Sequence, residues 1–146
     1  MSTKLTDLQP DVQGKAQLAT EQLTAAGIPF AVTSTLRTEA EQMALFAQGR
    51  DALPAVNLLR SQAGMPPIGA SDNSYTVTNA DGVTYKSNHQ GGRALDVVPV
   101  NAAGNPVWPD HKDPRWEQIA AVMKANGFQW GGDWPRFPDF PHYEIA

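Results

Sequence analysis

Residues 87–100 read SNHQGGRALDVVPV and join a small-residue loop to a nearly unbroken apolar run. The run Ala94–Val100 predicts a central strand that is covered on both faces. The two glycines before it carry no Cβ, so the backbone can curl tightly just ahead of the strand. We therefore expect that His89, at the end of the loop, and Asp96, on the strand, can point at one metal ion.

Hydrophobic periodicity and turn-forming residues divide the rest of the chain. Thr38 and Glu41 form the capping-box pattern of a helix start, and Asp113-Pro114 marks another start. The sequence predicts one compact α+β domain over residues 1–146, with helices packed on a small antiparallel sheet. Helices are expected over Asp11–Ala26, Glu39–Gln48, Pro54–Gln62 and Pro114–Ala125, strands over Ile28–Thr35, Ala94–Val100 and His142–Ile145, and a hairpin pairs Tyr75–Thr78 with Val83–Lys86.

The composition excludes several classes of protein and site. The chain has 146 residues, no cysteine and a formal net charge of −4. Without cysteine there is no disulfide framework, no cysteine nucleophile and no thiolate metal site. The acidic balance argues against nucleic acid or an anionic membrane as the main partner, since both call for a basic face. A metal ion must then be held by carboxylates and by His89, His111 or His142.

The first ten residues, MSTKLTDLQP, lack the basic start and the apolar run of a signal peptide. No apolar stretch approaches the roughly 18 residues that a membrane-spanning helix needs. We therefore expect a protein that is made in the cytoplasm without membrane insertion. Export, if it occurs, must use another route.

A second histidine joins the first pair of candidate ligands. His142 lies far from His89 in sequence but just ahead of another predicted strand. Together with Asp96 the two histidines supply two imidazoles and one carboxylate, and three such ligands plus an open position for water suit a catalytic zinc ion. Each histidine also suits an ordinary surface or core position, where imidazoles are commonly just hydrogen-bonded. The spacing alone leaves both interpretations open.

Two carboxylates near His142 are candidate general bases. Asp139 lies in Pro138-Asp139-Phe140-Pro141, where the prolines stiffen the segment that enters the last strand. A carboxylate held there suits a role in moving a proton to and from water and the leaving amine. The alternative is a turn-stabilising aspartate that bonds its own backbone. Glu144 shares the strand face of His142 and is the competing base.

Arg37 follows a predicted strand and precedes a helix cap, a frequent position for functional groups. Its guanidinium suits a carboxylate or a developing oxyanion, although its position alone favours a surface pair with Glu39 or Glu41. His111 lies in a polar loop and is expected to be solvated. Five aromatic residues lie close together near the end of the chain: Trp130, Trp134, Phe137, Phe140 and Tyr143. They are expected to form part of the hydrophobic core and the wall of a cleft. A cleft lined by such residues would also suit a peptide attached to a sugar.

These residues together resemble a known family. Residues 87–96, SNHQGGRALD, fit the pattern S-x-H-x-x-G-x-A-x-D. That pattern is typical of zinc peptidases that include bacterial D-alanyl-D-alanine carboxypeptidases and phage L-alanyl-D-glutamate endopeptidases. The chain looks like the endopeptidase (endolysin) branch in residues 127–134, GFQWGGDW, and 139–144, DFPHYE, and also in 36–42, LRTEAEQ, and 46–50, FAQGR.

The resemblance implies a fold and a set of roles. The fold is that of the D-alanyl-D-alanine carboxypeptidase and hedgehog-like zinc peptidases. One zinc ion is bound by His89, Asp96 and His142. Asp139 takes the place of the acid–base carboxylate, Arg37 faces the substrate and stabilises the oxyanion, and Ser87 contacts the peptide at the rim.

The expected function is hydrolysis of the peptidoglycan stem peptide between L-alanine and D-glutamate, by a monomer that acts on the cell wall after release. The first alternative is a D,D-carboxypeptidase that removes the terminal D-alanine. The second is a non-catalytic module that keeps zinc for stability. Asp139 and Arg37 argue against that module, because a structural zinc site needs neither. The cations expected to favour a D-glutamyl residue are Arg37, Lys86, Arg93 and Arg136.

Overall fold

The computed structural model describes all residues from Met1 to Ala146. The chain contains four α-helices and four β-strands, together with three short 3-10 helices. It divides into two compact units. One unit comprises residues 2–36 and 91–146, and the other comprises Met1 and residues 37–90.

The unit of residues 2–36 and 91–146 is built on one antiparallel sheet. Its strands are β1 (Phe30–Ser34), β2 (Ala94–Pro99), β3 (Gln129–Trp130) and β4 (His142–Glu144), in the spatial order β1-β2-β4-β3. β2 therefore lies inside the sheet and pairs with β1 and β4, both antiparallel. Because all but one of its side chains are buried, β2 is the central strand that the sequence predicts.

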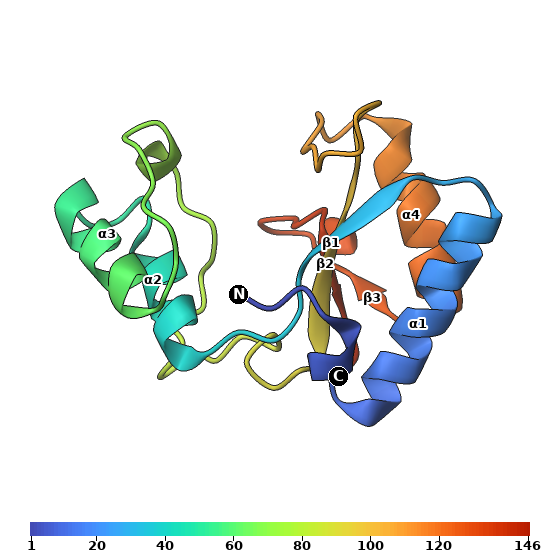
Figure 1. Ribbon diagram of the computed structural model, residues 1–146, viewed down its shortest axis with the longest axis horizontal. Helices are drawn as coiled ribbons and strands as arrows, with labels where there is room; N and C mark the ends of the chain where they lie inside the picture. Colours follow the sequence, from blue (N-terminus) through green and yellow to red (C-terminus); the bar gives the residue numbers. More distant parts are fainter. The chain divides into compact units, whose positions relative to one another are not determined.

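Two helices cover this sheet and complete its core. α1 (Pro10–Ala25) and α4 (Pro114–Ala125) contact each other, and α4 also contacts β2 (Figure 1). α4 begins where the sequence predicts, because Asp113 accepts a hydrogen bond from the N–H of Arg115 and a proline occupies the first turn. Its buried face is also the predicted one: Trp116, Ile119, Ala120 and Met123.

The second unit carries the other two helices, α2 (Glu39–Ala47) and α3 (Leu53–Gln62), which pack against each other. The predicted capping box is present, since the Thr38 hydroxyl accepts from the N–H of Glu41 and the Glu41 carboxylate accepts from the N–H of Thr38. The buried core of this unit is small: Ala44, Leu45 and Met65.

The hairpin predicted within residues 75–86 is wrong, because these residues form a loop without strands. The Asp81 carboxylate accepts hydrogen bonds from two backbone N–H groups just after it, each at 2.9 Å. The buried Gln42 side chain donates to the carbonyl of Ala80 at 2.9 Å. The Arg50 guanidinium donates to the carbonyl of Thr78 at 2.8 Å. Side chains thus occupy backbone groups in both predicted strands, which a hairpin would pair with each other.

The predicted fold class, helices on a small antiparallel sheet, is confirmed. The extent of the domain as a single unit of residues 1–146 stays a prediction. The sequence did not predict β3, which has only two residues. None of the helices is long and apolar enough to cross a bilayer.

Two leucines of α1 test whether the sheet-covering core carries the stability of this unit. Leu23 is fully buried, whereas Leu18 on the same helix is 49% exposed. Leu23→Ala is expected to lower the free energy of unfolding by about 2–5 kcal/mol, through lost burial and a cavity. Leu18→Ala is expected to change it by less than about 0.5 kcal/mol. Urea denaturation of both variants checks this, and equal losses would contradict the assigned helix face.

Candidate metal centre

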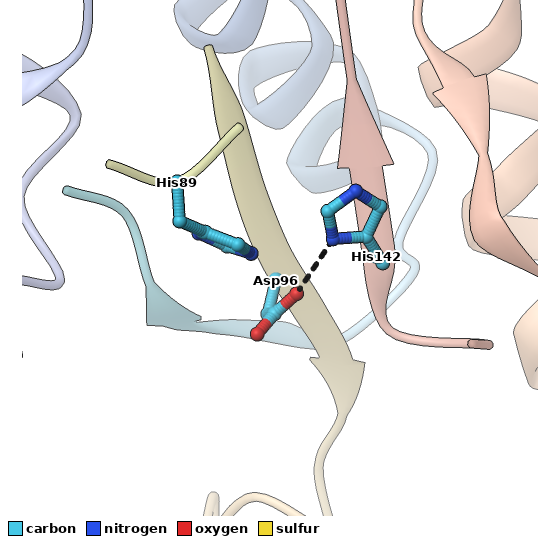
Figure 2. Close-up of side chains that lie close together, drawn as sticks. All are labelled: His89, Asp96 and His142. Carbon is cyan, nitrogen blue, oxygen red and sulfur yellow. Dashed lines mark ion pairs between the residues drawn. The ribbon is translucent and has the colours of Figure 1, made fainter. Parts of the chain in front are cut away.

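Asp96 and His142 are brought together by strand register. In the antiparallel pair of β2 and β4, Asp96 lies opposite His142, and the neighbouring Leu95 lies opposite Tyr143. Side chains alternate between the two faces of a sheet, so one pair enters the core and the other leaves it. Leu95 and Tyr143 are fully buried in the core, and Asp96 Oδ1 lies 3.7 Å from His142 Nδ1 on the opposite face (Figure 2).

His89 is fixed by the loop that precedes β2. Its backbone N–H donates to the Ser87 hydroxyl at 3.2 Å, and its carbonyl accepts from the N–H of Arg37 at 3.1 Å. The Gln90 side chain closes the loop, since it accepts from the N–H of Ser87 and donates to the carbonyl of Gly82. The His89 side chain is only 1% exposed. The backbone of His89 is thus fixed on both sides by hydrogen bonds, and its imidazole is buried.

Gly92 allows the tight path between this loop and β2 that the sequence predicts. Its φ is +68°, a conformation that favours glycine. A Cβ at this position would lie 3.2 Å from the backbone nitrogen of Gln9. The Gln9 N–H donates to the Gly92 carbonyl at 2.9 Å, so the backbone of the N-terminal segment lies directly against the curl.

The three predicted metal ligands form one cluster. One donor atom from each of His89, Asp96 and His142 lies within 4.8 Å of the others. Figure 2 shows the two imidazole rings flanking the Asp96 carboxylate. Both histidines are buried and Asp96 is half-buried. Two imidazole nitrogens and one carboxylate oxygen are the donor set of many catalytic zinc sites, so the residues fit such an ion.

The electrostatics around His142 also suit a cation. Burial alone lowers the pKa of the His142 imidazole, but the neighbouring carboxylates of Asp96, Glu144 and Asp139 outweigh it and raise the pKa to about 9. Glu144 Oε2 lies 3.6 Å from Nε2, while Asp96 is on the Nδ1 side. Glu144, predicted as the competing base, therefore holds the ring from the nitrogen opposite Asp96.

Asp139 lies in a tight turn that leads into β4. Its carbonyl accepts from the N–H of His142 at 3.2 Å, and its own N–H donates to the carbonyl of Gly131 at 2.9 Å. A Cβ on Gly131 would collide with the Asp139 carbonyl and lie 3.0 Å from the Cβ of His142. Gly131 thus permits the close approach that fixes Asp139 beside His142, a role that no sequence pattern predicts.

Arg37 and Gln42 form a second arrangement that the sequence predicted only in part. The Arg37 guanidinium donates to the side-chain carbonyl of Gln42 at 3.2 Å. Gln42 is fully buried, and its amide nitrogen donates in turn to Thr78 and Ala80. Gln42 thereby orients Arg37. No sequence pattern marked Gln42, because its burial depends on contacts with residues far along the chain.

The remaining candidates have other partners or are exposed. His111 is exposed, as predicted, and stacks on Phe140 with ring centroids 4.1 Å apart. Arg93 pairs with Asp11 and bonds the carbonyls of the last two residues, so its guanidinium ties down the chain end. Lys86 and Arg136 are exposed.

The chain is similar to known peptidases. A family model described as D-alanyl-D-alanine carboxypeptidase matches residues 80–145. The chain is 29% identical over 145 residues to the peptidoglycan L-alanyl-D-glutamate endopeptidase CwlK of Bacillus subtilis (strain 168), covering 95% of this chain and 74% of the relative. The predicted family resemblance is confirmed.

Solved structures agree with this resemblance. The crystal structure of the Serratia marcescens L-Ala D-Glu endopeptidase ChiX matches with a TM-score of 0.59 and 25% identity, over 97% of this chain and 83% of that chain. A structure of the vancomycin resistance D,D-pentapeptidase VanY in complex with Zn(II) matches with a TM-score of 0.56 and 15% identity, over 94% of this chain and 72% of that chain. At that identity the second match supports the fold alone.

The contact between Glu144 and His142 yields a prediction about metal affinity. A carboxylate that holds the far nitrogen of a ligating histidine fixes the ring and raises its basicity. Glu144→Gln is therefore expected to weaken Zn²⁺ binding by about 10- to 100-fold. Competition with a chromogenic chelator measures this, with Glu21→Gln on the exposed face of α1 as the control. Unchanged affinity in Glu144→Gln would show that Glu144 does not support the ligand.

Proposed function

We propose that this chain is a zinc peptidase that hydrolyses the bond between L-alanine and D-glutamate in peptidoglycan stem peptides. The observation that carries the proposal is the cluster of His89, Asp96 and His142, with donor atoms within 4.8 Å of one another. The choice of bond is supported by the similarity to endopeptidases of that name from Bacillus subtilis and Serratia marcescens.

The proposed ligands of a single zinc ion are His89, Asp96 and His142. Three protein ligands leave a fourth position of a tetrahedral site for water or substrate. When bound, zinc lowers the pKa of water toward neutrality and polarises the carbonyl of the substrate. The protein's part is to hold both imidazoles aimed at one point, which the backbone contacts of His89 and the Glu144 contact of His142 support.

Asp139 is the proposed general base and acid. Its turn holds the carboxylate close enough to the His142 ring for its charge to raise the pKa of that ring. In this position Asp139 accepts a proton from the attacking water and later donates it to the leaving amine nitrogen. Glu144 is the weaker candidate, since its carboxylate is committed to the far side of His142.

Arg37 and Ser87 are the proposed contacts to substrate. The buried Gln42 fixes the Arg37 side chain from one nitrogen, and a guanidinium carries further donors for an oxyanion or a carboxylate. The Ser87 oxygen accepts from the N–H of His89. A hydroxyl that accepts one hydrogen bond can still donate another, to a peptide carbonyl.

The second candidate function is a D,D-carboxypeptidase that removes the terminal D-alanine. The description of the family model that matches residues 80–145 favours it. Both candidates act on cell-wall peptide and share the metal and the acid–base chemistry. They differ in that a carboxypeptidase must recognise a free terminal carboxylate. Synthesis in the cytoplasm, later release and a monomeric state remain predictions.

Defined muropeptides separate the two candidates. The purified protein, loaded with zinc, is incubated with a disaccharide pentapeptide, and the products are identified by mass. The proposed function predicts a free peptide that begins with D-glutamate and a disaccharide that keeps only L-alanine. Release of D-alanine with the L-alanyl-D-glutamate bond intact would establish the carboxypeptidase instead.

Asp139→Asn tests the general base. The amide keeps the size of the side chain but cannot accept the proton, so turnover is expected to fall by about 10²- to 10⁴-fold. Zinc content and melting temperature are expected to stay near those of the parent, because Asp139 is not a ligand. Glu144→Gln, assayed at saturating zinc, serves as the matched carboxylate control and retains most turnover. If Glu144→Gln lost turnover and Asp139→Asn retained it, Glu144 would be the general base instead.

Metal removal tests the ion itself. Chelation is expected to abolish hydrolysis and to lower the melting temperature, because zinc binds the folded state. At a free zinc concentration of 100 times Kd the stabilisation is about 2.7 kcal/mol. Calorimetry with and without zinc, together with elemental analysis of the same sample, checks this. Full hydrolysis by a sample free of metal would refute the proposed chemistry.

A further inference from the structure

In the loop before Asp139, one aromatic residue combines an unfavourable backbone conformation with an exposed side chain. Phe137 has a φ of +51° and is the one residue other than glycine with a positive φ. It is also 78% exposed, more than any other large hydrophobic residue of the chain. A bulky residue rarely adopts this conformation, and the following Pro138 further favours extended backbone at this position. The backbone is thus strained at a side chain that burial does not stabilise.

Strain of this kind collects at functional sites, and Phe137 lies beside one. Two Cα–Cα steps separate it from Asp139, so the two Cα atoms are at most about 7.6 Å apart. A second aromatic side chain of the same loop, Trp134, contacts the candidate ligand His142 with ring centroids 5.1 Å apart. Trp134 is 37% exposed, so part of its surface is accessible next to the site.

We propose that Trp134 and Phe137 form an aromatic subsite for the sugar that carries the stem peptide in peptidoglycan. This proposal rests on the proposed function, because it concerns the same substrate. Stem peptides consist mainly of small and charged residues, which offer little apolar surface to a ring. A pyranose has a flat face of C–H groups that covers an aromatic ring well.

The position of the cleaved bond makes this occupant reachable. Only one residue, L-alanine, separates the L-alanyl-D-glutamate bond from the sugar, and one extended residue spans about 3.3–3.6 Å. The sugar of a substrate held at His142 and Asp139 therefore lies close to residues that contact or immediately precede them. The bond that a D,D-carboxypeptidase cuts is several residues farther from the sugar.

A pair of matched substrates tests the subsite. One is a disaccharide stem peptide, and the other is the same peptide without sugar. The parent protein is expected to cleave the first with a kcat/KM about three- to tenfold higher, the range for one favourable ring contact. Phe137→Asn removes the ring but keeps a residue that tolerates positive φ. This variant is expected to lose most of the preference, chiefly through a higher KM for the disaccharide substrate.

Stability and a matched aromatic serve as controls. Because the backbone at Phe137 is strained, Phe137→Asn and Phe137→Gly are expected to keep or raise the melting temperature, so their loss of preference is not a folding defect. Trp108→Ala removes an aromatic side chain that is 61% exposed and lies outside this loop. It is expected to leave the ratio of the two kcat/KM values unchanged.

Each other outcome is decisive. If Phe137→Asn lowers kcat/KM equally for both substrates, the ring contacts the peptide and the sugar subsite is wrong. An unchanged preference in Phe137→Asn, or no preference in the parent, also overturns it. Failure of the proposed function is a different result, in which the parent leaves the L-alanyl-D-glutamate bond of both substrates intact. That result removes the subsite as well.

Discussion

Asp96 and His142 face each other across β2 and β4, and the proposed metal site depends on this one cross-strand pair. The same register sends Leu95 and Tyr143 into the core. Burial of those two side chains therefore fixes which face the aspartate and the histidine occupy. The energy that holds two candidate ligands in place is hydrophobic and is supplied by the opposite side of the same two strands.

Backbone contacts refine what the register sets up. The carbonyl of Gly131 anchors Asp139, and the absence of a Cβ on Gly131 lets the turn before β4 approach closely. Around His142 the carboxylates of Asp96 and Glu144 take opposite ring nitrogens. The three acidic groups therefore differ in their proposed roles, since Asp96 is a candidate ligand, Glu144 orients the ring and Asp139 moves protons.

Much of this arrangement could be predicted from residues whose local chemistry is strong. The Thr38–Glu41 capping box, the Asp113-Pro114 helix start and the apolar run of β2 all formed as expected. The hairpin within 75–86 failed because Asp81 and Arg50 occupy backbone groups of its two predicted strands, and a distant side chain leaves no trace in a local pattern. β3 was missed because two residues show no periodicity. The parts played by Gly131 and Gln42 depend on contacts that only the folded chain reveals.

The core residues and the candidate ligands alternate along the same pair of strands, and this limits how the sequence can change. A single inserted or deleted residue between Asp139 and Glu144 would invert the last strand, exchanging histidine for tyrosine on each side. His142 would then enter the hydrophobic core, and Tyr143 would face the candidate metal site. Changes in length are therefore better tolerated elsewhere, because in this short segment the number of residues matters as much as their identity.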